Sequence, residues 1–244
     1  MTGADRKAEL AANLAEVEER VAAACRAAGR ARDEVQLIAV TKTFPASDAA
    51  LLADLGVTHV GENRDQEAGP KAAEVAELRP EAALRWHMVG RLQRNKARSV
   101  VEWAHEVQSL DSARLADALA KAVHTVRYAD KRDEPLDVLI QVSLDDDPGR
   151  GGCPLGELAA LADHVTHTGE LRLRGLMAVA PLGGDPSAAF ERLAAAGEKL
   201  RKDHPNAAAV SAGMSHDLEQ AITHGSTCVR VGTALLGGRG LASP

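Results

Sequence analysis

Short apolar runs alternate with longer amphipathic stretches along almost the entire chain. The runs have the length of buried strands and lie at residues 36–41, 59–61, 84–89, 107–109, 137–142, 172–178, 209–211 and 228–231. Helical stretches separate them, at residues 47–55, 65–78, 94–103, 112–124, 154–167, 186–203 and 215–224. A strand–helix–strand order favours right-handed crossovers within a parallel sheet. Eight such strands predict an α/β fold, a single (β/α)8 TIM barrel, and the alternative is an open, doubly wound sheet.

One further helix is predicted ahead of the first strand, at about residues 5–28. Its apolar positions recur at helical spacing, namely Leu10, Leu14, Val17 and Val21. Gly29 then follows as a stop signal. No Pro/Ser-rich linker or shift in composition divides the rest of the chain. We therefore expect residues 1–244 to form a single domain, with the barrel at about residues 35–238.

The composition excludes several classes of protein. The net charge of −6 gives no general case for nucleic-acid binding. The cysteines, Cys25, Cys153 and Cys228, form no C-x-x-C pair, which argues against a disulfide framework or a structural zinc site and favours a reducing compartment. No apolar stretch approaches the length of a membrane span, and the N-terminus lacks the apolar core of a signal peptide. We expect a soluble, cytoplasmic protein without nucleic-acid or membrane partners.

Lys42 is the first candidate functional residue. It follows the apolar run at 37–41 and precedes Pro45, which breaks the strand. An amine at the mouth of a hydrophobic strand loses hydration, and this favours the neutral form that attacks an aldehyde to give a Schiff base. A lysine at this place can instead extend to solvent, with its stem along the apolar surface. The remaining motifs decide between these two interpretations.

Two turns that contain glycine and a hydroxyl residue follow the last two predicted strands. Gly213 allows close backbone approach. Ser215 begins the predicted helix at 215–224, where it is interpreted as a helix cap, as an anion ligand, or as both. Gly232 and Thr233 follow the eighth strand. Because the loops after strands seven and eight form the recurrent phosphate site of TIM barrels, the sequence predicts a phosphate site and a reactive amine at one mouth.

Six motifs occur in an order that is typical of one known family. They are Val40–Thr43, Gly61–Asn63, Trp86–Lys96, Leu173–Met177, Ser211–Asp217 and Val229–Thr233. Together they closely resemble the pyridoxal phosphate homeostasis protein family, and the resemblance runs from about Val35 to Gly238. It implies a barrel like the N-terminal domain of alanine racemase, with pyridoxal 5′-phosphate (PLP) as the cofactor.

The resemblance also implies a set of cofactor-binding residues. These are Lys42, Asn63, Met177, Ser211, Met214, Ser215, Arg230, Gly232 and Thr233. Lys42 would carry PLP as a Schiff base. Ser215, Gly232 and Thr233 match positions that hold the phosphate. Arg230 matches an arginine that faces the pyridine nitrogen and keeps it unprotonated, which weakens the ring as an electron sink.

Both methionines of this set are expected on or near the ring, with a core position as the alternative for each. Two positions depart from the family pattern. The loop at 148–152 has Arg150 where the family has a lysine or a similar residue, and Phe44 stands where a polar or basic residue is common. Phe44 is expected to alter only the rim of the site. Asp145 to Asp147 lack the spacing of a metal loop, so no metal site is predicted.

Two further features carry more than one interpretation. His87 is interpreted as a hydrogen-bonded structural histidine, with a proton shuttle as the alternative. A basic cluster follows the third strand and consists of Arg91, Arg94, Lys96 and Arg98. It is interpreted as a solvated helix face, with guidance of anionic vitamers or contact with a partner enzyme as the alternative.

The expected function is that of a non-catalytic PLP-binding protein in intracellular PLP homeostasis. Its expected partners are PLP, related B6 vitamers and PLP-dependent apoenzymes, and we expect a monomer. Racemases of the related fold use a second, all-β domain and a tyrosine, whereas here the single tyrosine, Tyr128, precedes the fifth strand and the chain ends after the eighth βα unit. The alternatives are a small PLP-dependent racemase or lyase with Lys42 as its only base, and a class I aldolase-like barrel without cofactor.

Overall fold

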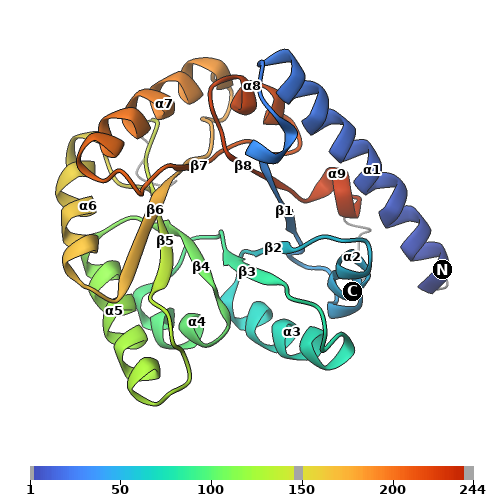
Figure 1. Ribbon diagram of the computed structural model, residues 1–244, viewed down its shortest axis with the longest axis horizontal. Helices are drawn as coiled ribbons and strands as arrows, with labels where there is room; N and C mark the ends of the chain where they lie inside the picture. The colour runs from blue at the N-terminus through green and yellow to red at the C-terminus, as the bar shows by residue number, and fades with distance from the viewer. Residues whose placement is uncertain (1–2, 146–150, 239–244) are drawn as a thin grey trace.

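Eight parallel strands among the described residues close into a barrel, in which β1 pairs with both β2 and β8 (Figure 1). The computed structural model describes residues 3–145 and 151–238. The strands are β1 (Gln36–Val40), β2 (His59–Glu62), β3 (Arg85–Met88), β4 (Glu106–Leu110), β5 (Leu136–Gln141), β6 (Leu171–Met177), β7 (Ala209–Ser211) and β8 (Cys228–Val231). Because the two edges of the sheet pair with each other, the predicted TIM barrel is confirmed and the open sheet is ruled out.

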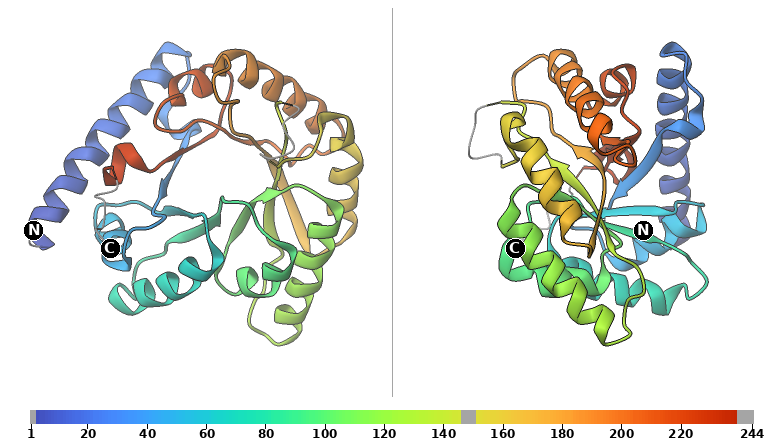
Figure 2. Two further views of the ribbon diagram at one scale, coloured as in Figure 1. Left: turned by 180° about the vertical axis from the view of Figure 1, so that it is seen from behind. Right: turned by 60° about the vertical axis from the view of Figure 1, so that its left-hand side comes forward.

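Helices surround the sheet and connect successive strands (Figures 1 and 2). They are α1 (Gly3–Ala27), α2 (Ala46–Asp54), α3 (Asp65–Leu78), α4 (Ala97–Trp103), α5 (Ala113–Tyr128), α6 (Leu158–His167), α7 (Pro186–Asp203), α8 (Leu218–Thr223) and α9 (Thr233–Leu236). Short 3₁₀ helices are η1 (Arg32–Glu34), η2 (Arg94–Lys96) and η4 (Leu155–Glu157). The apolar core is built mainly from Ala, Val and Leu, which lets helices lie close to a sheet that is itself rich in these residues.

Polar side chains cross the inside of the barrel beside aliphatic ones such as Ile38 and Val40. Ser211 of β7 donates a hydrogen bond to Gln108 of β4 at 2.7 Å, and these strands are not neighbours, so the bond crosses the interior. At the N-terminal end of the strands, Asp137 pairs with Arg85 at 3.1 Å and with Arg172 at 2.5 Å. Branched aliphatic residues dominate the interior of TIM barrels in general. A polar interior needs internal partners instead, and the hydrogen bonds described here provide them.

The structure corrects the start of the helix that the sequence predicted at residues 215–224. α8 begins at Leu218 with Asp217 as its N-cap, so Ser215 lies ahead of the helix and does not cap it. Met214 donates its N–H to Asp217 Oδ1 at 2.6 Å. This bond between a side chain and the preceding backbone competes with helix formation and lengthens the loop after β7. The structure also adds α9, which is too short for its periodicity to be seen in the sequence.

The N-terminal helix α1 was predicted correctly, and it packs against α8 and α9 (Figure 1). Leu10, Val17 and Val21 form its buried face. On the neighbouring side, Arg20 pairs with Glu219 of α8 at 2.8 Å. The helix therefore covers the barrel where β8 meets β1 and reaches the loops that follow β7 and β8.

Replacing Gly213 with alanine should destabilise the protein. A Cβ there would lie 2.7 Å from Ala221 Cβ and 3.0 Å from Leu218 Cα, and the backbone has φ +95°. Backbone strain and overpacking each cost about 1–3 kcal/mol, so we expect urea denaturation to report a loss of ~3 kcal/mol in the free energy of unfolding. Gly156→Ala is the control, because nothing lies within 4 Å of the added Cβ. Equal stability of the two variants would contradict this packing.

Candidate functional site

A cavity of about 230 Å³ opens at the C-terminal ends of the barrel strands. Seven of the nine predicted cofactor-binding residues line it: Lys42, Asn63, Met214, Ser215, Arg230, Gly232 and Thr233. The other two, Met177 and Ser211, are almost fully buried and are paired in the register of β6 and β7. They lie behind the lining residues. The cavity thus occupies the face on which TIM barrels build their sites.

A tight turn carries Lys42 out of β1 and into the cavity wall. Phe44 donates its N–H to Thr41 O at 3.1 Å, which closes a four-residue turn. Thr43, inside that turn, has φ +66°, a strained conformation for a β-branched residue. Strain of this kind persists only where surrounding contacts fix the backbone. Phe44 does not line the cavity and packs beneath Arg6, whose guanidinium carbon lies 5.6 Å from the ring centroid.

Buried charges next to this turn provide those contacts. Lys71 of α3 donates to Thr41 O at 2.8 Å and to Glu62 Oε1 at 2.6 Å. Thr41 Oγ1 donates to the same Glu62 oxygen at 2.6 Å, and all three residues are buried. The Lys71 amine is therefore occupied. Within residues 3–145 and 151–238, in contrast, no hydrogen bond or ion pair engages the Lys42 amine, which leaves it available to a ligand.

Another wall of the cavity comes from the loops after β7 and β8. Ser215 Oγ accepts a hydrogen bond from Ala234 N at 3.3 Å, which joins the two loops. Arg20 of α1 donates to Ser215 O at 3.0 Å and so holds the same loop from outside. Gly232 lies close to β1, since a Cβ there would approach Val40 O to 3.3 Å. These contacts fix the hydroxyl and backbone donors that face the cavity.

Arg230 brings a buried positive charge to the cavity. Burial lowers the pKa of its guanidinium from the ordinary value. The group still carries its charge at neutral pH, because a guanidinium is not deprotonated in proteins. Nη1 donates to Ser211 Oγ at 2.6 Å, and Nη2 donates to Ala178 O at 2.9 Å. Both partners are neutral, and the carboxylate of Asp217 is a nearby negative charge that favours the charged form of Arg230.

A chain of hydrogen bonds links Arg230 to the partly buried carboxylate of Glu106 across the barrel. Ser211 Oγ donates to Gln108 Oε1 at 2.7 Å, and Gln108 Nε2 donates to Glu106 Oε1 at 2.8 Å. Because the Ser211 hydroxyl proton points to Gln108, the Ser211 oxygen is free to accept from Arg230. All bonds therefore run in one direction, from Arg230 through Ser211 and Gln108 to Glu106.

Two histidines extend this chain beyond Glu106. His87 Nδ1 lies 3.0 Å from Glu106 Oε1, and His59 Nδ1 lies 2.9 Å from His87 Nε2. Burial raises the pKa of the Glu106 carboxyl, but the hydrogen bond and the charge of His87 outweigh it, and the net shift is downward. His87 has a partner on each ring nitrogen and does not line the cavity, which favours its interpretation as a structural histidine.

Other residues considered from the sequence lie away from the cavity. Tyr128 ends α5, is exposed and does not line the cavity. The Asp-rich loop and Arg150 fall largely within residues 146–150, outside the described residues. In the part of the chain that the structure covers, no group of His, Cys, Asp and Glu could hold a metal ion. Arg91, Arg94 and Lys96 line a separate and larger pocket.

Comparison with known proteins decides the family. The alanine racemase N-terminal domain family matches residues 12–240. The pyridoxal phosphate homeostasis protein of Mycobacterium leprae is 47% identical over 248 residues, which cover 98% of this chain and 96% of that protein. This chain belongs to the same family. The Escherichia coli K12 member is 39% identical over 240 residues, which cover 95% of this chain and 97% of that protein.

Among solved structures, the PLP-bound structure of PipY, from Synechococcus elongatus PCC7942, is similar to the structure of this chain, with a TM-score of 0.79. The two sequences are 33% identical, and the match covers 93% of this chain and 100% of PipY. The alanine racemase-like barrel implied by the six motifs is therefore confirmed. So is the family that those motifs resemble.

The histidine chain predicts a loss of stability in mild acid. Burial and the positive charges of His87 and Arg85 lower the pKa of His59 from 6.5 to about 4, although Glu106 opposes the shift. Below pH 6.5 the unfolded chain binds a proton that the folded protein excludes, so stability falls from pH 6.5 to about 4. After allowance for partial exposure, we expect His59 to contribute on the order of 1 kcal/mol.

His59→Asn tests this expectation, because asparagine keeps a hydrogen-bonding group near the Nδ1 position but does not titrate. Urea denaturation between pH 7 and 4.5 should show a shallower decline in the variant than in the wild type. His224→Asn, at a partly exposed histidine whose side chain has no hydrogen bond or ion pair to the described residues, is the control and should decline like the wild type. An equally steep decline in His59→Asn would contradict the assignment.

Proposed function

We propose that this protein binds PLP through Lys42 and holds it without turnover, as part of intracellular PLP homeostasis. The observation that carries the proposal is that one cavity contains both a lysine amine with no partner among the described residues and a buried, permanently charged arginine, Arg230. The names of the relatives and the PLP-bound structure of PipY support the same cofactor.

The residues present fit PLP in size and chemistry. A volume of about 230 Å³ equals that of roughly eight water molecules at ~30 Å³ each, which suits a single substituted ring. PLP supplies an aldehyde that condenses with a primary amine to give a Schiff base and water. We assign the phosphate to Ser215, Gly232 and Thr233, because hydroxyl and backbone N–H groups form strong hydrogen bonds to an anion.

The remaining predicted site residues receive positioning roles. Asn63 and Met214 line the cavity and are assigned to the walls beside the ring. Ser211 accepts from Arg230 and fixes the direction of its guanidinium. Met177 is buried beside Ser211 in the sheet and supports it by packing.

Arg230 is the residue that favours holding over turnover. Its bonds to Ser211 and Ala178 use two of its five N–H groups, which leaves others for a ligand. Facing the pyridine nitrogen, a guanidinium donates a hydrogen bond and cannot accept the ring proton, so the ring stays unprotonated. An unprotonated ring is a weaker electron sink than a protonated one, which disfavours the carbanion chemistry of the alternative function, a PLP-dependent racemase or lyase.

We further propose a cytoplasmic monomer whose single domain consists of the N-terminal helix and the barrel. Its partners would be PLP, related B6 vitamers and the apoenzymes that receive PLP. Cys25, Cys153 and Cys228 are buried and unpaired, which is consistent with a reducing compartment. Across the described residues, no helix has the length and apolar character needed to cross a membrane.

Reconstitution of the wild type and Lys42→Ala with PLP tests the proposal. We expect a visible absorbance band in the wild type and its complete loss in Lys42→Ala, with unchanged circular dichroism. Lys199→Ala, at an exposed lysine of α7, is the matched control and should keep the band. A band that survives in Lys42→Ala would remove Lys42 from the proposal.

The same samples separate holding from turnover. After incubation with single enantiomers of amino acids in deuterated water, we expect no more α-proton exchange in the wild type than in Lys42→Ala. Prompt exchange that depends on Lys42 would favour the racemase or lyase. A wild type that stays colourless after reconstitution would instead favour the aldolase-like alternative.

A further inference from the structure

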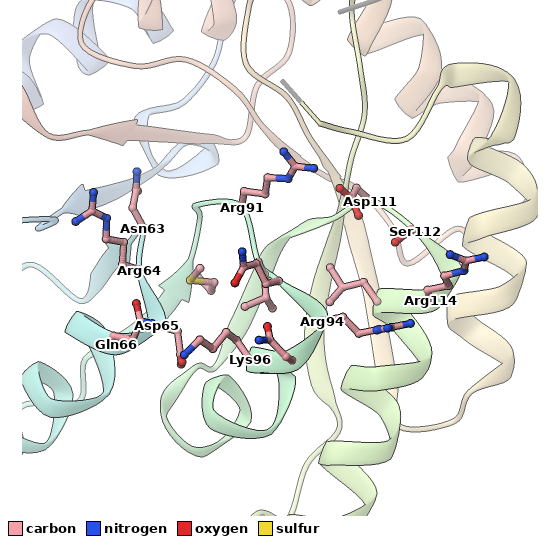
Figure 3. Close-up of a pocket in the computed structure, with 15 residues that line it drawn as sticks. Asn63, Arg64, Asp65, Gln66, Arg91, Arg94, Lys96, Asp111, Ser112 and Arg114 are labelled. Atoms are coloured by element: carbon pink, nitrogen blue, oxygen red, sulfur yellow. The ribbon is translucent and has the colours of Figure 1, made fainter. Parts of the chain in front are cut away.

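A second and larger pocket lies beside the Lys42 cavity on the same face of the barrel. Its volume is about 1030 Å³, and it is formed by the segments that follow β2, β3 and β4 (Figure 3). Asn63 lines both the pocket and the Lys42 cavity. Binding pockets for small organic molecules commonly measure ~300–1,000 Å³, so this one is large enough for a ligand bigger than a single ring.

The pocket has an excess of positive charge. Among the described residues, the cations of its lining that form no hydrogen bond or ion pair are Arg91, Arg94, Lys96 and Arg114. Arg64 also lines it and pairs with Glu67 at 3.0 Å. The lining contains two carboxylates, Asp65 and Asp111. Asp65 accepts a hydrogen bond from Trp103 Nε1 at 2.9 Å. In a chain of net charge −6, this local excess attracts anions.

Close backbone packing forms the wall between the two sites. Val89 and Gly90 both donate their N–H groups to Glu62 O, at 2.9 and 3.3 Å. A Cβ on Gly90 would lie 2.3 Å from Asn63 O, so the backbone that leads into Arg91 is packed directly on Asn63. The backbone that carries Arg91 is thus anchored next to the Lys42 cavity.

The charged groups are arranged along the pocket and do not cover a flat surface. Figure 3 shows Arg94, Ser112 and Arg114 at one end and Asn63 and Arg64 at the other, with Arg91 between them. Ser112 is the N-cap residue of α5, but its side chain makes no cap hydrogen bond, so its hydroxyl is free for a ligand. Two guanidiniums and a hydroxyl can donate hydrogen bonds to the oxygens of a phosphate monoester.

We propose that this pocket binds a phosphorylated small molecule, with its phosphate between Arg94 and Arg114 and its organic part on the apolar lining. That lining is the floor of the pocket, where Met88, Leu92 and Leu115 present the small part of their side chains that the core leaves exposed. The concave shape favours a small ligand over an acidic protein surface. The phosphate ester has two possible sources, a second B6 vitamer waiting beside Lys42 or a nucleotide. The vitamer source rests on the proposed function, whereas the site itself does not.

Isothermal titration on PLP-loaded, borohydride-reduced protein tests the proposal, because reduction keeps the Lys42 cavity filled. The probes are pyridoxamine 5′-phosphate, AMP and inorganic phosphate. We expect one equivalent of an ester to bind, with Kd raised at least ~10-fold in both Arg94→Gln and Arg114→Gln. Arg98→Gln is the matched control, because Arg98 belongs to the same basic cluster but does not line the pocket.

Binding of pyridoxamine 5′-phosphate alone supports the vitamer source, and binding of AMP alone supports the nucleotide. The proposal is overturned if neither ester binds saturably, if Arg98→Gln weakens binding as much as Arg94→Gln, or if inorganic phosphate binds as tightly as the esters. PLP loading is read independently from absorbance before the titration. Protein that does not load is titrated directly, so failure at Lys42 is distinguishable from failure at this pocket.

Discussion

The pairing of β1 with β8 is the contact on which the rest of the site depends. It aligns Ile38 with Arg230 and Ala39 with Val231, so the first and last strands of the barrel end side by side. Lys42 follows the end of β1, and Gly232 and Thr233 follow the end of β8. Residues at opposite ends of the sequence thereby line one cavity. α1 reinforces this seam from outside, where it packs on α8 and α9.

The polar interior follows from the buried charge at Arg230. An unpaired guanidinium inside a barrel is costly unless its N–H groups are satisfied and its charge is offset. Ser211 Oγ and Ala178 O accept from it, and Ser211 and Gln108 lead on to Glu106 across the interior. Because its direct partners are neutral, the guanidinium can face the cavity. A directly paired carboxylate would draw the guanidinium away from the cavity. Arg230 is therefore available to a ligand and is still held in a fixed orientation.

Local patterns were sufficient to predict the barrel and the strand ends that line the cavity, whereas the family resemblance supplied the roles of residues such as Asn63 and Arg230, which stay predictions. Lys42 and the Gly232–Thr233 turn stand directly after apolar strands, and a strand end can be located from its neighbours in the sequence. The start of α8 was predicted wrongly because Asp217 bonds back to Met214, a local competition that periodicity does not detect. The Lys71–Glu62 pair was missed because a lysine within an amphipathic helix has no local mark of burial.

Borohydride reduction of the PLP-loaded protein, followed by peptide mass mapping, tests the central claim most directly. Lys42 is the cavity amine without a protein partner in the described chain, whereas the Lys71 amine is held by Glu62 and Thr41. The account predicts a pyridoxyl group on the peptide that contains Lys42 and on no other. A pyridoxyl group on Lys71 or Lys96, with Lys42 unmodified, would contradict it.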